Sequence, residues 1–194
     1  MPLESLLTEI RACRYCEAHL PLGPRPVLSA APSARILIAG QAPGTRVHAT
    51  GIPWNDPSGD KLRKWLDMDR EFFYDETNIA IIPLGFCYPG KGKGGDLPPR
   101  PECADLWQDR LMEALPNVKL ILALGQYAIK YHLKKKRKKN LTETVKDWQL
   151  YAKDGVIPLV HPSPRNFRWH RKNPWFEEEV VPEMRIKVWE ALDE

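Results

Sequence analysis

Four cysteines are the only thiols of this 194-residue chain, and their spacing suits a metal site. Cys13 and Cys16 form a C-x2-C pair, and Cys87 and Cys103 are separated by fifteen residues. Four thiolates bind zinc or an iron–sulfur cluster, whereas disulfides are disfavoured in the cytosol. The alternative is four scattered buried thiols, but the surrounding sequence is polar and rich in proline. We expect a structural metal site, because closing a long loop removes much of its freedom.

A polar loop at residues 40–56, GQAPGTRVHATGIPWND, carries further side chains that could do chemistry. It has neither the Walker pattern nor the Rossmann glycine pattern, so nucleotide hydrolysis is not the first hypothesis. A tight Gly/Pro turn is followed by Arg46, His48, Trp54 and Asp56. Trp54 either stacks on a nucleobase or lies in the core beneath the loop.

A second polar loop at residues 160–172, VHPSPRNFRWHRK, places His161 directly after an apolar run. A histidine at that position can donate a hydrogen bond to a developing negative charge, and a structural histidine is the alternative. The cations and aromatic residues that follow it are typical of a surface that contacts a phosphate backbone.

The elements that must position these loops alternate between strand and helix. Short apolar runs bounded by Gly or Pro predict buried strands at Arg35–Ala39, Asn78–Leu84, Val118–Leu124 and Val156–Val160. Helical spacing predicts helices at Leu3–Ala12, after an N-cap at Ser58, at Cys103–Leu115, after Gly125 and at Val180–Leu192. A single α/β domain over residues 1–194 follows, with a parallel sheet covered by helices on both faces. The polar loops leave the carboxyl ends of its strands, where ligands bind.

Charge is unevenly distributed along the chain, whose formal net charge is +4. Residues 130–139 hold seven basic side chains and no acid, whereas residues 176–194 hold seven acids and two bases. This asymmetry indicates either a side that faces a polyanion or a solvated lysine-rich loop. No apolar run approaches the roughly 18 residues of a membrane span, and the first residues lack a signal-peptide pattern. We therefore expect a cytoplasmic protein without a membrane partner.

In their order and spacing, the motifs resemble the uracil-DNA glycosylase superfamily, and most closely its iron–sulfur-containing bacterial and archaeal (family 4-like) branch. The matching segments are Cys13 and Cys16, GQAPG at 40–44, GIPW at 51–54, Cys87 and Cys103, LGQYA at 124–128, and HPSP at 161–164. The resemblance spans nearly the whole chain. It implies a three-layer α/β/α sandwich with a four-stranded parallel sheet, and a [4Fe-4S] cluster on the cysteines, with zinc as the alternative.

The resemblance also implies DNA repair, by hydrolysis of the N-glycosidic bond of uracil or a related base in DNA. His161 matches the family residue that donates to the base oxygen, and Trp54 stands where the family has a stacking Phe. The expected catalytic residues are His161, Gln41, His48 and Asp56. The expected base-binding residues are Gly40, Ala42, Pro43, Gly44, Trp54 and Pro83. The expected DNA contacts are Ser163, Arg165, Asn166, Arg168, Lys135 and Lys136.

Two positions depart from the family pattern. Gln41 stands where the branch has a carboxylate that positions water, and an amide cannot act as a general base. Pro83 stands where the family has an Asn that reads the uracil edge, and proline offers neither an amide nor an N–H. The candidates to replace these groups are His48, Asp56, Asn55, and the backbone near Leu84 and Gly85.

Three hypotheses therefore remain open. The first is a monomeric glycosylase that acts on DNA containing uracil or another altered base. The second is a DNA-binding member of the same fold that has lost catalysis. The third is a metal-bearing protein whose basic loops contact another protein.

Overall fold

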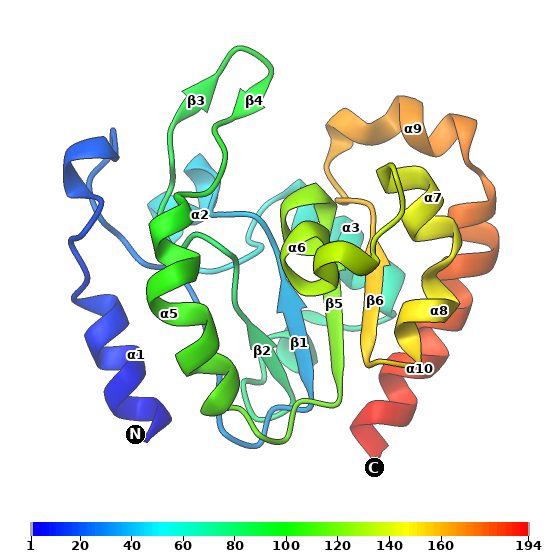
Figure 1. Cartoon of the computed structure of the whole chain (residues 1–194), viewed down its shortest axis with the longest axis horizontal. Coiled ribbons are helices and arrows are strands. Elements are labelled where there is room, and N and C mark those ends of the chain that lie inside the picture. Colours follow the sequence, from blue (N-terminus) through cyan, green and yellow to red (C-terminus); the bar gives the residue numbers. More distant parts are fainter. Residues whose placement is uncertain (1, 194) are drawn as a thin grey trace.

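A computed structural model describes residues 2–193 and places four parallel strands in one sheet, in the order β2-β1-β5-β6 (Figure 1). The strands are β1 (Ile36–Ala39), β2 (Ile79–Ile81), β5 (Leu120–Leu124) and β6 (Val156–Leu159). All four predicted strands are confirmed, each shorter than its apolar run. β2 ends ahead of Pro83, and proline has no N–H to donate to a ladder.

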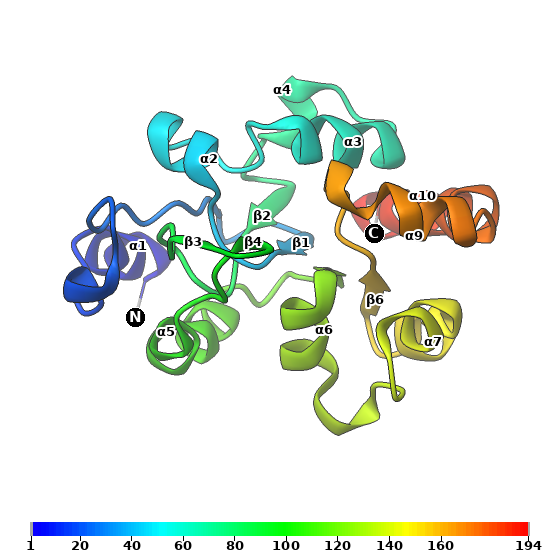
Figure 2. The same ribbon diagram turned by 90° about the horizontal axis from the view of Figure 1, so that it is seen from above.

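Helices cover both faces of the sheet, as the view from above shows (Figure 2). On one face lie α3 (Pro57–Leu66) and α10 (Val181–Asp193), and on the other lie α5 (Pro101–Glu113) and α6 (Gly125–Leu133). At the edges, α1 (Leu3–Arg11) packs beside α5, while α7 (Leu141–Lys146) and α8 (Trp148–Ala152) pack against β6. The predicted three-layer α/β/α sandwich with a four-stranded parallel sheet is confirmed.

Shorter elements complete the connections. They are α2 (Thr45–Thr50), α4 (Arg70–Phe73), α9 (Phe167–Lys172) and a hairpin of β3 (Lys91–Gly92) and β4 (Gly95–Asp96). Single 3-10 turns lie at Glu17–His19, Lys134–Lys136 and Pro164–Asn166, and a π-helical turn at Phe176–Val180 precedes α10. The hairpin projects above the carboxyl ends of the sheet strands (Figure 1).

The core explains why the strands could be recognised in the sequence. Ile36, Leu37, Ile38 and Ala39 are all at most 1% exposed, because helices cover both faces of the sheet. Parallel strands buried in this way consist of continuous apolar runs. No helix within residues 2–193 is both long enough and apolar enough to span a bilayer.

Helix α3 begins two residues earlier than predicted. Its N-cap is Asp56, whose Oδ1 accepts a hydrogen bond from the Gly59 backbone N–H at 2.8 Å. The predicted cap, Ser58, lies inside the first turn and is buried. Pro57 explains the shift, because its fixed φ and missing N–H suit the first helical position. The prediction of Ser58 as the cap was therefore wrong, and the cap carboxylate belongs to Asp56.

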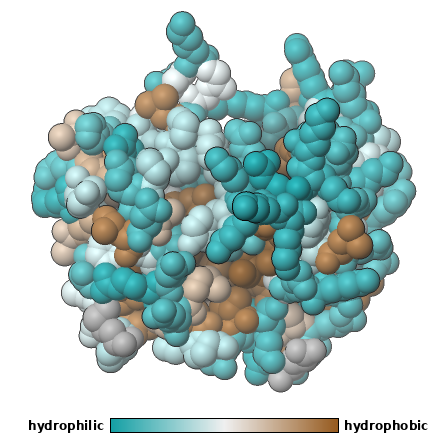
Figure 3. Space-filling model, viewed as in Figure 1, coloured by the Kyte–Doolittle hydropathy of each residue, from teal (hydrophilic) through white to brown (hydrophobic). Residues whose placement is uncertain are grey.

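Most of the surface visible in Figure 3 is hydrophilic. Long hydrophilic side chains project over the place where α6 lies in the same view of Figure 1. Residues 134–139, which follow α6, are all exposed.

Candidate functional site

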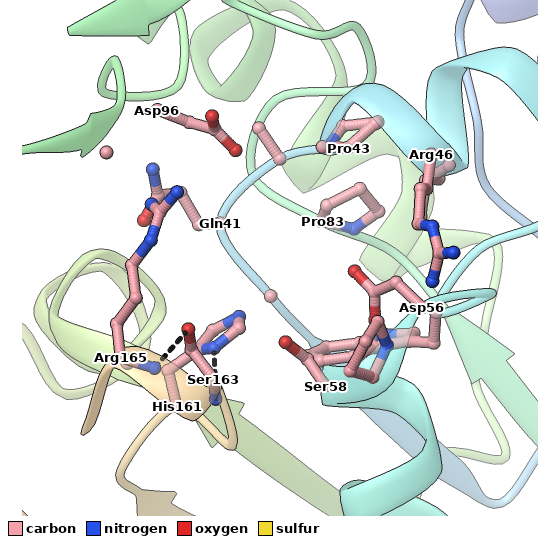
Figure 4. A pocket seen from close by; sticks show the side chains of 18 of the residues that line it. Gln41, Pro43, Arg46, Asp56, Ser58, Pro83, Asp96, His161, Ser163 and Arg165 are labelled. Carbon is pink, nitrogen blue, oxygen red and sulfur yellow. Dashed lines mark hydrogen bonds between the residues drawn. The ribbon is translucent and has the colours of Figure 1, made fainter. Parts of the chain in front are cut away.

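A cavity of about 730 Å³ lies at the carboxyl ends of the sheet strands, at the edge that the sequence predicts for a ligand (Figure 4). It brings together the loops that follow β1, β2, β5 and β6, and the tip of the β3–β4 hairpin. The predicted residues in its lining are Gly40, Gln41, Ala42, Pro43, Gly44, Trp54, Asp56, Pro83, His161, Ser163, Arg165 and Asn166. Two loops that are more than a hundred residues apart in the sequence thus form one site.

His161 enters the cavity from the loop after β6, in a fixed orientation. Its Nδ1 accepts a hydrogen bond from the Ser163 backbone N–H at 3.2 Å (Figure 4). Its carbonyl accepts one from the Asn166 side chain at 2.8 Å. Burial lowers the pKa of His161 to about 4, although the Asp56 carboxylate acts in the opposite direction. The imidazole is therefore neutral near pH 7. Because Nδ1 accepts a hydrogen bond, the ring proton is on Nε2, which is a donor.

Gly125 makes room for this histidine. Its φ is +83°, in the region that favours glycine, and a Cβ there would lie 3.3 Å from the Cβ of His161. The first residue of α6 and the loop after β6 can therefore approach closely.

Trp54 stacks on the His161 ring, with ring centroids 5.3 Å apart and planes 27° from parallel. The indole also lies against Gly40, where a Cβ would be only 3.1 Å from the Trp54 Cζ2 atom. Trp54 has a φ of +56°, which is unusual for a bulky residue. Its carbonyl accepts from the buried Arg63 guanidinium at 3.2 Å, which holds this conformation.

A substitution at Gly59 tests how tightly Trp54 is held. A Cβ at Gly59 would lie 1.7 Å from the Trp54 carbonyl oxygen, an overlap that only a backbone shift could relieve. Helix propensity favours Gly59→Ala by about 1 kcal/mol, but the overlap dominates. We expect Gly59→Ala to lower the free energy of unfolding by about 2 kcal/mol, which lowers Tm by about 4 to 8 °C in a thermal melt.

The matched control is Gly94→Ala, in the same cavity lining. A Cβ at Gly94 has nothing within 4 Å, so its Tm should stay close to that of the unchanged protein. A Gly59→Ala protein whose Tm equals or exceeds that of Gly94→Ala would contradict the close approach of Gly59 to the Trp54 carbonyl.

Gln41 and Pro83 form part of the cavity wall, and each makes a hydrogen bond within the protein. The Gln41 side-chain amide donates to the Leu97 carbonyl at 3.1 Å, which fastens the β3–β4 hairpin over the cavity. The Pro83 carbonyl accepts from the buried Gln108 side chain at 2.8 Å. Its hydrogen-bonding capacity is thus used within the protein, so Pro83 presents an apolar ring to the cavity.

Asp56 supplies a carboxylate that faces the cavity beside Ser58 (Figure 4). One of its oxygens is used by the helix cap described above, and the other accepts no hydrogen bond from within residues 2–193. A carboxylate oxygen that has no protein donor can accept a hydrogen bond from a water molecule.

The sequence did not single out Asp96, and gave Arg46 no role, yet both line the cavity. Asp96 follows the glycine-rich tip of the hairpin, and its Oδ2 would lie 3.5 Å from a Cβ at Gly44. The only signal in the sequence is the unusual length and Gly/Pro content of residues 83–103.

Four predicted residues are not part of the cavity lining. His48 lies on α2 near Tyr88, with ring centroids 6.3 Å apart, and its carbonyl accepts from Arg25 at 2.6 Å. Arg168 is exposed on α9. Lys136 forms an ion pair with Asp154 at 2.7 Å, whereas Lys135 lines a separate groove.

The four cysteines line one small hollow between the N-terminal segment, the loop after β2 and α5. The Phe86 backbone N–H donates to the Cys103 Sγ at 3.4 Å. Burial raises the pKa of Cys87 to about 11 and that of Cys103 to about 12, so both are neutral thiols when no metal is bound. Among residues 2–193, no three His, Cys, Asp or Glu side chains are grouped closely enough for a single ion.

The site can therefore hold a planar ring beside Trp54, donate a hydrogen bond from a neutral His161 and orient water at Asp56. A family model described as the Uracil DNA glycosylase superfamily matches residues 28–185 of the chain.

Proposed function

Because the chain belongs to the uracil DNA glycosylase superfamily, we propose that it hydrolyses the N-glycosidic bond of uracil or a related altered base in DNA. The observation that carries this proposal is His161, a neutral imidazole whose Nε2–H donor lies beside an aromatic platform in a cavity. An everted base needs both, because it loses its stacking partners and gains negative charge as it leaves.

In the proposed reaction, the bond between C1′ of the sugar and the base nitrogen breaks, and its electron pair leaves with the base. His161 donates a hydrogen bond to the base oxygen, where that charge develops. A water molecule adds to C1′, and the Asp56 carboxylate accepts its proton. The negative Asp56 also stabilises positive charge on the sugar as the bond breaks.

Trp54 and the backbone of residues 40–44 form the proposed binding surface for the everted base. Gln41 forms part of the wall, and the Pro83 side chain makes no hydrogen bond to the polar edge of the base. The pocket therefore does not depend on the amide that discriminates uracil in the family pattern. For this reason the proposed substrate class includes other deaminated bases.

We propose DNA as the partner of a monomeric cytoplasmic protein. Ser163, Arg165 and Asn166 are at the cavity and Arg168 is exposed nearby on α9, so these residues are the proposed phosphate contacts at the damaged nucleotide.

A panel of duplex oligonucleotides that carry uracil, hypoxanthine or xanthine tests the proposal. Release of any of these bases, detected as strand cleavage at the abasic product, supports it. Salt-dependent DNA binding without release from any of them would favour the alternative, a DNA-binding member of the fold without catalysis.

The cysteine hollow is proposed to hold a [4Fe-4S] cluster. Four thiols that share one hollow, with a backbone N–H donor to Cys103, fit such a group. Zinc is the alternative occupant, because four thiolates also bind zinc. When bound, the cluster would join the N-terminal segment to residues 87–103 and take no part in hydrolysis.

Spectroscopy tests the cofactor. Protein purified without oxygen is expected to be brown, with broad visible absorbance and with iron and sulfide in equal amounts. Cys103→Ser should lose that absorbance and melt at a lower temperature. A colourless protein that contains stoichiometric zinc would contradict the cluster.

A further inference from the structure

A second, strongly basic groove lies after α6, outside the base cavity. It is open, about 520 Å³ in volume, and lined by Lys130, Lys134, Lys135, Arg137, Lys138 and Lys139. Lys134, at the C-terminal end of α6, has a φ of +50°, a conformation that non-glycine residues seldom adopt. The chain turns there, so that Lys130 on the helix and Lys139, nine residues later, line the same groove.

The cations of this groove are largely uncompensated. Lys138 pairs with Asp147 at 3.2 Å, but the other five form no ion pair within residues 2–193. The neighbouring Asp154 pairs with Lys136, which is not in the lining. A net positive groove of this kind attracts a polyanion.

The chemistry of the lining distinguishes nucleic acid from protein as that polyanion. Every lining residue is Lys or Arg, and none is apolar. Protein interfaces need a desolvated apolar or aromatic centre. Binding to a phosphate backbone needs none, because release of counterions from the nucleic acid supplies the affinity.

Helix α6 links the groove to the base cavity. Its first residues, Gly125 and Gln126, line the cavity, and Lys130, in its second turn, lines the groove. Gln126 and Lys130 are four residues apart, an axial rise of about 6 Å, and the helix ends at Leu133, about 10 Å from Gln126. These lengths correspond to about two to three base pairs at roughly 3.4 Å per step.

We propose that this groove binds the phosphate backbone of the same duplex, about two to three base pairs to one side of the everted base. The inference rests on the proposed function and deepens it. The groove supplies affinity and positions the duplex, and it contributes nothing to bond cleavage. DNA on the other side of the base does not reach it.

Two double variants test the groove at equal charge. Lys135→Gln/Lys139→Gln removes two unpaired groove cations, and Lys146→Gln/Lys153→Gln removes two exposed lysines outside the lining. For the groove variant, the slope of log K against log salt should fall by about 1.8, since each phosphate contact contributes about 0.9. The control should keep nearly the full slope. The control should also release base at the unchanged single-turnover rate when enzyme is saturating.

Duplex length provides the second measurement. Duplexes with one arm cut to about one base pair from the damaged base no longer reach the groove, so they should bind the groove variant and the unchanged protein equally well. This equality should hold for one arm only, because the groove lies on one side. Equal salt slopes for the two double variants would overturn the inference. So would an affinity difference between the groove variant and the unchanged protein that remains whichever of the two arms is cut short.

The remaining outcomes separate the two proposals. If the unchanged protein binds no duplex at low salt and releases no base, the proposed function itself fails. The protein could instead release base while its groove binds poly-glutamate and does not bind the DNA that flanks the damaged base. The groove would then bind an acidic protein, and the inference would be overturned.

Discussion

Replacing His161 by alanine is expected to slow single-turnover base release by about 10²- to 10³-fold. That range corresponds to the loss of one pre-positioned donor to a developing negative charge, about 2.7 to 4 kcal/mol. The donor is in place before the reaction, because the Ser163 N–H fixes the ring and burial keeps it neutral. Rapid-quench measurements on whichever duplex of the panel is cleaved will give the rate.

Two controls separate chemistry from folding and binding. His161→Gln keeps a side-chain N–H donor and should recover part of the lost rate. Affinity for an undamaged duplex should change little in either variant, since His161 is not among the proposed phosphate contacts. A His161→Ala protein that folds and releases base at the unchanged rate would refute the role.

The pH dependence of the unchanged protein provides an independent check. With a pKa lowered to about 4, His161 keeps the same protonation state from pH 8 down to about pH 5. Base release should therefore show no transition near pH 6.5, the value of an ordinary histidine. Because folding depresses this pKa, the unfolded chain takes up a proton first as pH falls. The contribution of His161 to stability is therefore lost progressively between about pH 6.5 and pH 4.

Replacing Asp56 by asparagine is expected to lower base release by about 10²-fold, the lower end of the range for loss of a general base. The substitution keeps the shape of the side chain and removes its negative charge. Asparagine also caps helices about as well as aspartate, so α3 and the Tm should be preserved. Single-turnover rates and a thermal melt, measured on the same preparation, check both parts.

Asp69→Asn is the matched control for Asp56. Asp69 is the N-cap of α4, and its Oδ1 accepts from the Phe72 N–H at 2.8 Å, the same distance as at Asp56. It does not line the cavity. Equal losses of activity in both variants would show that capping, and not the carboxylate in the cavity, accounts for the effect.

The sheet and its functional edge could be predicted because their signals are local. A buried parallel strand must be apolar on both faces, so β1 and β5 are visible as short runs of Ile, Leu and Ala, and β6 as a short apolar run of Val, Ile, Pro and Leu. Loops that leave such strands meet at one edge, so the sequence predicts that the loops of Gly40 and His161 lie together, as they do in the cavity.

Side-chain direction was less accessible to sequence. Arg46 and His48 are two residues apart on α2, so they point to opposite sides of the helix. Arg46 lines the cavity, whereas His48 lies near Tyr88 and is not in the lining. The sequence around these residues lacks the length and periodicity that would have revealed this six-residue helix.

Long-range contacts were the least predictable. Asp96 reaches the cavity because Gln41 holds the segment after it and β3 pairs with β4. A strand pair of two residues each, built from Gly, Lys and Asp, has no alternation to detect. Similarly, the basic run was evident, but the pairing of Lys136 with Asp154 depends on tertiary structure.

The fixed neutrality of His161 also bears on which bases can leave. A neutral imidazole stabilises an anion but transfers no proton to it, so the departing base must carry away its electron pair as an anion. Rates across a series of substrates should then follow the acidity of the free base at the nitrogen that was bonded to the sugar. Such a site selects by leaving-group quality as well as by shape. Bases that depart readily only after protonation, as adenine does, are excluded even where they fit the cavity.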